Sequence, residues 1–165
     1  MKKYQIIYAD PPYIGQAKRH YGTEEVNHIN LVAELLQYDG WALSCSTPTL
    51  HTILCLLTEA QAVYRIGAWV KPFCSFKPNV NPAYAWEPVV FKPARNRGRD
   101  RLTARDWVSA NITLKKGLSG VKPDAFSFWL FEILGAEPTD EFIDMFPGSG
   151  AVTRAWNKWI TGAMK

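Results

Sequence analysis

Residues 6–15 of the chain are IIYADPPYIG. The apolar run that ends at Ala9 predicts a strand over residues 4–9 that is buried on both faces and stopped by two prolines. Asp10 follows this strand directly, and Pro11 and Pro12 stiffen the backbone beside it. We therefore expect a rigid tip with hydrogen-bond acceptors at the end of a buried strand.

The rest of the chain alternates between strands and helices. Apolar runs predict strands at 41–46, 63–70, 86–92 and 141–146, and amphipathic or capped segments predict helices at 24–37, 48–60, 123–135 and 151–159. In the first helix Thr23 is the expected N-cap, and Ile29, Val32, Leu35 and Leu36 have helical spacing. This alternation predicts an α/β fold with a mostly parallel sheet and helices on both faces.

A second strand end is also unusual in composition. The strand at 141–146 runs into DMFPGSG, residues 144–150, where Gly148 and Gly150 allow a tight turn and a close approach to a ligand. No lysine follows the turn, so a phosphate-binding P-loop is not supported. This turn is compatible with a phosphate, a dinucleotide or the methionine part of S-adenosylmethionine. The alternative is a glycine turn that connects a strand to a helix and binds no ligand. Since ligands bind beyond the carboxyl ends of parallel strands, both unusual ends should open on one crevice.

The chemistry of the first tip favours a planar base. Asp10 and the carbonyl oxygens beside the prolines accept hydrogen bonds, and Tyr13 offers a flat ring. Acceptors beside a ring suit an exocyclic amino group, and a base in a duplex must turn out of the stack to reach them. The alternative is a rigid turn without a ligand.

At these residues the chain resembles the amino-methyltransferases, which use S-adenosylmethionine to methylate the exocyclic nitrogen of adenine or cytosine. Five segments are similar to family motifs: DPPY at 10–13, YRIGAWVKP at 64–72, WEPVVFKP at 86–93, GVKPDAF at 120–126 and DMFPGSG at 144–150. The segment that resembles the catalytic motif, residues 10–13, comes before the one that resembles the cofactor loop, residues 144–150. This order resembles that of the beta class of DNA adenine methyltransferases. YQIIYADPPY also resembles the messenger-RNA adenosine methyltransferase family and its phage and bacterial relatives, a family that usually has tryptophan in place of Tyr13. The resemblance implies a Rossmann-like class I methyltransferase sheet, circularly permuted and shortened, with about five to six strands.

The resemblance also implies roles for individual residues. Asp10, Pro11, Pro12 and Tyr13 would be catalytic and would hold the adenine, and Lys122 would pair with the carboxylate of the cofactor. Asp10, Asp144, Phe146, Gly148 and Gly150 would shape the S-adenosylmethionine pocket. In the relatives a further strand ends in an acid that holds the ribose; ITGAMK contains no acid, so Asn157 or a group from a second subunit is expected to substitute.

A basic segment is the candidate for contact with nucleic acid. Residues 93–119 are expected to form a basic loop, which is the only candidate for a target-recognition element within a single domain, residues 1–165. Its arginines, together with Lys18 and Arg19 in the loop after the tip, suit a phosphate backbone; a solvated loop is the alternative. The arginines are Arg95, Arg97, Arg99, Arg101 and Arg105. Trp107 would either stack on a base or anchor the loop as a buried residue.

Composition limits the remaining possibilities. The chain has 165 residues, 47% of them hydrophobic, and a net charge of +4. Its three cysteines and three histidines are scattered, so no metal site is expected, and no apolar run predicts a membrane span. We expect a cytoplasmic protein of a bacterial or phage-infected cell that acts on DNA. RNA is the alternative substrate, and a homodimer, a non-catalytic accessory subunit or another small-molecule enzyme remains open.

Overall fold

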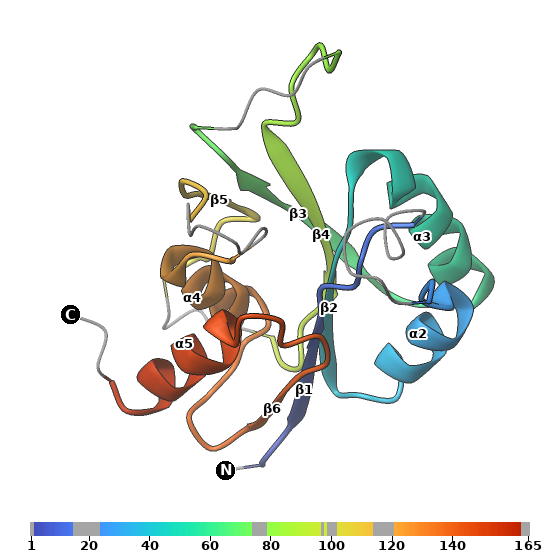
Figure 1. The fold of residues 1–165 in the computed structure, drawn as a ribbon. Coiled ribbons are helices and arrows are strands. Elements are labelled where there is room, and N and C mark those ends of the chain that lie inside the picture. The colour runs from blue at the N-terminus through green and yellow to red at the C-terminus, as the bar shows by residue number, and fades with distance from the viewer. Residues whose placement is uncertain are drawn as a thin grey trace.

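The computed structural model describes residues 2–14, 24–73, 79–96, 98, 102–113 and 121–162. Within these residues, six strands form one sheet in the order β5-β3-β4-β2-β1-β6 (Figure 1). The strands are β1 (Gln5–Ala9), β2 (Gly40–Ser44), β3 (Arg65–Val70), β4 (Trp86–Lys92), β5 (Trp107–Ser109) and β6 (Glu141–Asp144). The helices are α2 (His28–Leu35), α3 (Thr47–Glu59), α4 (Asp124–Ile133) and α5 (Ala151–Ile160).

The strand directions confirm the mostly parallel sheet. β1 pairs in parallel with β2 on one side and with β6 on the other. β4 is antiparallel to both β2 and β3, while β5 is parallel to β3. β4 alone therefore runs against the others, and its first residues lie at the edge where the other strands end.

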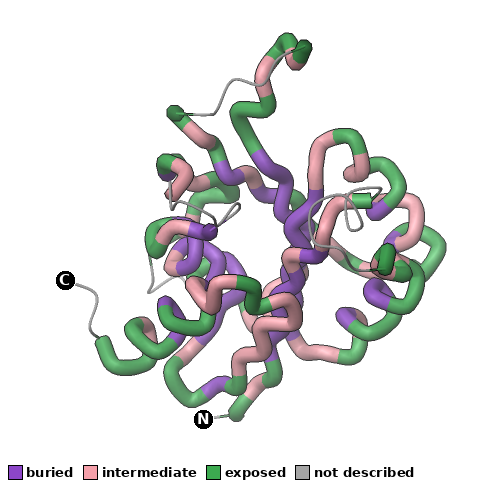
Figure 2. The backbone as a smooth tube through the Cα atoms, viewed as in Figure 1, coloured by how far each residue is buried: buried purple, intermediate pink, exposed green. Residues whose placement is uncertain are grey.

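Helices cover both faces of the sheet, as expected (Figure 1). Along β1, Ile6 and Tyr8 join the core beneath α4 and α5, whereas Ile7 and Ala9 join the core beneath α2 and α3. Because side chains alternate along a strand, a strand between two helical layers must be apolar at every position. Figure 2 shows this as a band of buried residues through the middle of the sheet. Among the described residues, none of the helices is long and apolar enough to cross a membrane.

The predicted start of the first helix is wrong. α2 begins at His28, and Asn27 caps it by accepting hydrogen bonds from the backbone nitrogens of Ile29 and Asn30 at 3.0 and 3.1 Å. Thr23, the expected cap, lies outside the described residues. Ile29 is 66% exposed, so it does not belong to the buried face of the helix, which Leu31 completes instead.

The basic segment contains a strand that the sequence pattern did not predict. β5 pairs with the edge of β3, and the Trp69 side chain fixes the chain after it by donating Nε1–H to the carbonyl of Ala110 at 2.8 Å. Trp107 begins this strand and is 43% exposed. Trp107 is therefore not a buried anchor, and its stacking on a base stays a prediction.

Candidate functional site

The two unusual strand ends lie side by side. Tyr8 is in register with Asp144 across β1 and β6, and the backbone nitrogen of Met145 donates to the carbonyl of Tyr8 at 2.9 Å. Asp10 and the turn after Asp144 thus leave the sheet from neighbouring strands at the same edge. The expected adjacency of the two ends is confirmed.

Asp10 faces a buried lysine at this edge. Its Oδ2 lies 3.2 Å from Nζ of Lys122, which precedes α4, and a quarter of the Asp10 side chain remains exposed. Burial raises the pKa of Asp10 to about 6, although the charge of Lys122 acts in the opposite direction. Asp10 is therefore a partly open carboxylate whose charge the protein compensates incompletely.

Glu87 is a member of the site that was not predicted from the sequence. This second residue of β4 has a side chain only 5% exposed, and it binds two lysines: Lys122 through Oε1 and Lys71 through Oε2 at 3.0 Å. Burial by itself would raise the pKa of Glu87, but the charges of Lys122 and Lys71 outweigh it and lower the pKa to about 2. The available signal in the sequence was a single acid near the start of the largely apolar strand WEPVVFK.

Tyr13 is connected to the same acid. Burial raises the pKa of Tyr13, and the charge of Glu87 together with a hydrogen bond between the Tyr13 hydroxyl and that carboxylate raises it further. The hydroxyl therefore stays protonated and donates. Asp10 and Tyr13, the two ends of the tip, are held by Lys122 and Glu87, and between them Pro11 is buried and Pro12 half-buried.

The glycine turn presents an unsatisfied acceptor. Asp144 Oδ2 accepts from the Thr153 hydroxyl at 3.1 Å, whereas its buried Oδ1 has no hydrogen-bond partner among the described residues. Burial raises the pKa of Asp144. Gly148 and Gly150 have φ angles of 47° and 70°, and Gly150 is the N-cap of α5. Both positions therefore favour glycine, and the hydrogen bond from Thr153 places the Asp144 carboxylate beside the first turn of α5.

Other residues expected at the cofactor are less directly connected to this turn. Lys122 was expected to pair with the carboxylate of the cofactor, and in this structure its ammonium group binds the carboxylates of Asp10 and Glu87. Phe146 is half-buried and packs against the core beneath α2 and α3. Asn157 is exposed on α5, about 10 Å along the helix from Gly150 at 1.5 Å per residue, so the structure does not bring it to the turn.

Arg95 lies at the opposite edge of the sheet. Its guanidinium forms a bidentate pair with Asp140 at 2.6 and 2.7 Å, donates to the carbonyl of Gly135 at 2.5 Å and stacks on the Tyr4 ring. Asp140 and Tyr4 precede β6 and β1, at the edge where these strands begin. The contacts of Arg95 are therefore internal and remote from Asp10.

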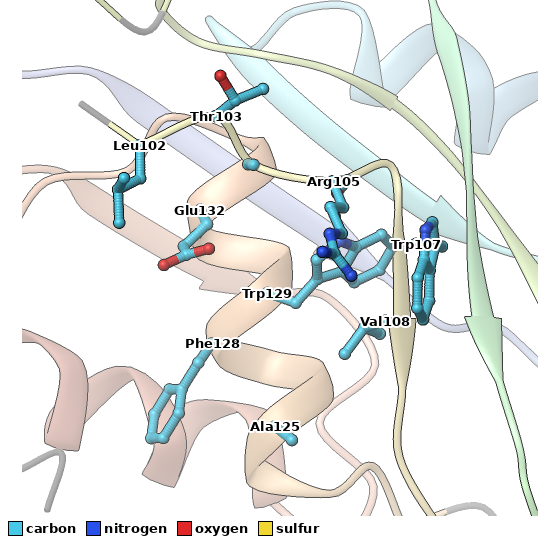
Figure 3. A pocket seen from close by; sticks show the side chains of 10 residues that line it. Leu102, Thr103, Arg105, Trp107, Val108, Ala125, Phe128, Trp129 and Glu132 are labelled. Carbon is cyan, nitrogen blue, oxygen red and sulfur yellow. The ribbon is translucent and has the colours of Figure 1, made fainter. Parts of the chain in front are cut away.

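Arg105 is exposed beside the edge strand. Its guanidinium lies over the Trp107 ring, 5.4 Å from the centroid, and its carbonyl accepts a hydrogen bond from Trp129 at 2.8 Å. A groove of about 420 Å³ lies between residues 102–108 and α4, and its lining includes Phe128 and Trp129. Figure 3 shows Arg105 and Trp107 among its lining residues. None of the acids described above lines this groove. Five expected contact residues, Lys18, Arg19, Arg97, Arg99 and Arg101, lie outside the described residues.

No group of metal-ligating side chains large enough to hold an ion occurs in the described part of the chain.

Comparison with known proteins identifies the fold. No protein-family model and no curated protein matches the chain. Among solved structures, the crystal structure of the M1.HpyAVI–SAM complex aligns with a TM-score of 0.60 and 22% sequence identity, covering 96% of this chain and 79% of the other. The crystal structure of M1.HpyAVI aligns with the same TM-score and 19% identity, covering 96% and 78%. The expected methyltransferase fold is thereby confirmed.

Proposed function

We propose that this chain is an S-adenosylmethionine-dependent methyltransferase that modifies the exocyclic amino group of adenine in DNA. The target base would turn out of the helix and enter the pocket between Asp10 and Tyr13. The observation that supports this most strongly is the adjacency of two strand ends: the partly exposed Asp10 beside the glycine turn of Asp144.

The residues at this edge fit the cofactor. Burial raises the pKa of Asp144, and this carboxylate keeps a buried oxygen without a hydrogen-bond partner among the described residues. An ammonium and a sulfonium group, both present in S-adenosylmethionine, would supply the missing positive charge. Gly148 and Gly150 would let the backbone approach it, and the fold neighbour M1.HpyAVI was solved as a SAM complex.

When bound, S-adenosylmethionine supplies an electrophilic methyl group. Asp10 and the carbonyl oxygens of Pro11 and Pro12 would accept hydrogen bonds from the amino group and orient its lone pair. The Tyr13 ring would stack on the base. Alignment of the two reactants would provide most of the rate enhancement. The amino nitrogen loses its proton after it has gained the methyl group, so no strong base is needed.

We further propose that residues 93–119 are a minimal target-recognition element within the domain that residues 1–165 form. Arg105 and Trp107 are exposed together, as a cation and a ring that contact a phosphate and a base would be. Lys18, Arg19, Arg97, Arg99 and Arg101 belong to the proposed contact set. Arg95 does not, because its guanidinium is already bound to Asp140. A homodimer would supply a group to the ribose side of the cofactor pocket in place of Asn157.

The test is a transfer assay with labelled S-adenosylmethionine. Purified protein meets double-stranded DNA, single-stranded DNA and RNA in parallel, and mass spectrometry identifies the methylated nucleoside. We expect methyl-adenine in DNA. If methyl-adenine formed in RNA alone, the substrate would be RNA and not DNA. No product from a folded protein that binds nucleic acid would favour an accessory subunit.

The variant Asp10→Ala tests the assigned chemistry. We expect transfer to be lost while S-adenosylmethionine binding, measured by calorimetry, is largely kept. Asp39→Ala is the matched control, because Asp39 accepts a backbone hydrogen bond from Gln5 at the opposite edge of the sheet. Equal losses in the two variants, or loss of cofactor binding in Asp10→Ala, would contradict the role of Asp10 in holding the base.

A further inference from the structure

Glu87 links the groups that surround the proposed base pocket. It accepts a hydrogen bond from Lys122, which also contacts Asp10, and it accepts another from the Tyr13 hydroxyl. Lys71 binds its second oxygen at 3.0 Å. A single buried carboxylate thus contacts both the ring expected to stack on the base and the cation that faces the catalytic acid.

The two carboxylates share Lys122 unequally. Glu87 has the shorter contact with Lys122 and a second lysine in addition, whereas Asp10 lies 3.2 Å from Lys122 and is a quarter exposed. Their pKa values reflect this difference: burial raises that of Asp10 to about 6, while the lysines lower that of Glu87 to about 2 against the effect of burial. The positive charge of Lys122 is directed mainly to Glu87, and Asp10 keeps acceptor capacity.

We propose that Glu87 is a positioning residue of the base pocket: it binds the Lys122 ammonium and the Tyr13 hydroxyl, and so leaves the Asp10 carboxylate free for the amino group of the base. This inference rests on the proposed function for the identity of the base. The effect of Glu87 on Asp10, however, is a property of the protein without any ligand.

The alternative is an ion pair that serves folding alone. A buried pair contributes little net stability compared with apolar residues of the same volume. A pair that serves folding alone would change the stability of the protein, but it would leave the kcat of a folded Glu87→Gln variant unchanged. The charged groups that act on Asp10 are Lys122, Glu87 and Asp144, and Tyr8 and Tyr13 also face it.

The first experiment measures the titration of Asp10 by carboxyl ¹³C NMR in the ligand-free protein, with Asp10→Asn to assign the signal. Without the negative charge of Glu87, Lys122 acts on Asp10 alone, so Glu87→Gln should lower the pKa of Asp10 below its wild-type value of about 6. Lys122→Met should raise it. The matched control is Glu141→Gln, which removes a half-exposed acid from β6 at the opposite edge. An Asp10 pKa that is unchanged or higher in Glu87→Gln overturns the proposal.

A second pair of variants covers the case in which Glu87→Gln does not fold. The double variant Glu87→Gln, Lys122→Met removes both charges of the most deeply buried pair, and the two ions that lose a partner, Lys71 and Asp10, are each partly exposed. Because Glu87 repels negative charge on Asp10, the double variant should titrate at lower pH than Lys122→Met alone. Equal Asp10 titrations in these two variants overturn the proposal.

Kinetics then separate positioning from stability. On the nucleic acid that the wild-type protein methylates, Glu87→Gln should lower kcat by about tenfold or more, with little change in the KM for S-adenosylmethionine. An unchanged kcat in a folded variant overturns the proposal. If the wild-type protein methylates no nucleic acid, the proposed function fails, while the NMR titration still decides whether Glu87 acts on Asp10.

Discussion

Replacing Arg95 by methionine should destabilise the fold without affecting the chemistry at Asp10. The Asp140 carboxylate has a fully buried side chain, and Arg95 supplies two of its four hydrogen bonds; the backbone nitrogens of Tyr4 and Glu137 supply the others at 3.0 and 2.8 Å. Removing one partner of a buried pair costs about 3–5 kcal/mol. Because two backbone donors remain, we expect about 3 kcal/mol, the lower end of this range.

Thermal unfolding measures this cost directly. For a chain of this length about 1 kcal/mol lowers Tm by roughly 2–4 °C, so the Arg95→Met variant should melt about 6–12 °C below the wild-type protein. Arg105→Met is the matched control: Arg105 is exposed and contacts only the Trp107 ring among the interactions described above, so its Tm should change by about 1–2 °C at most.

The pH dependence gives a second measure of the same pair. Burial by itself would raise the pKa of Asp140, but its hydrogen bonds to Arg95 and to the backbone lower it below the ordinary range. A carboxyl with a lowered pKa stabilises the fold above its unfolded pKa of about 4 and loses that contribution as the pH falls through its folded pKa. The difference in Tm between the wild-type protein and Arg95→Met should therefore become smaller as the pH falls through the folded pKa of Asp140.

A wild-type Tm in Arg95→Met would refute this reasoning. So would a gap that is constant from neutral pH into acid, because the loss would then not come from the ionised Asp140. If Arg95→Met weakened nucleic-acid binding while Arg105→Met did not, the division of roles between the two arginines would be reversed.

Three further predictions concern packing, protonation and charge. Gly40→Ala should cost about 1–3 kcal/mol in thermal unfolding, because its Cβ would lie 2.6 Å from the backbone nitrogen of Ala94; an unchanged Tm would show that this segment moves aside. The rate of methyl transfer should fall as the pH drops through about 6, because protonation of Asp10 removes an acceptor, and a constant kcat between about pH 8 and pH 5 would contradict this. The affinity for nucleic acid should fall steeply with salt, and Arg105→Met should reduce the slope of log K against log salt concentration by about one unit. A shallow slope in the wild-type protein would remove the basic segment from the proposed interface.

The sequence was sufficient for β1 and for the two strand ends. A run that is apolar at every position has few explanations other than a strand between two helical layers, and residues 6–9 are all buried. Parallel neighbours end at the same edge of a sheet, so two unusual strand ends predict one site. That part of the reasoning depends on local patterns alone, which is why Asp10 and Asp144 lie near each other as expected.

Glu87 and Arg95 could not be assigned in this way. Glu87 reaches the site only because β4 runs antiparallel to its neighbours, which brings the beginning of this strand to the edge where the others end. Arg95 is excluded from the proposed contact set because its guanidinium binds Asp140, which lies 45 residues later in the chain. Both assignments depend on pairings between distant residues, about which composition and spacing contain no information.

The hairpin of β3 and β4 also bears on how this fold can acquire specificity. The backbone nitrogen of Lys71 donates to the carbonyl of Ala85 at 2.8 Å, and β4 pairs with β3 on one side and with β2 on the other. These pairings fix the register of Glu87, and none of them involves the connection formed by residues 72–84. Segments of other lengths can therefore replace residues 72–84 while the acid keeps its position. Figure 1 shows this hairpin extending beyond the rest of the sheet. We therefore expect insertions and deletions in this connection to leave Glu87 at the site.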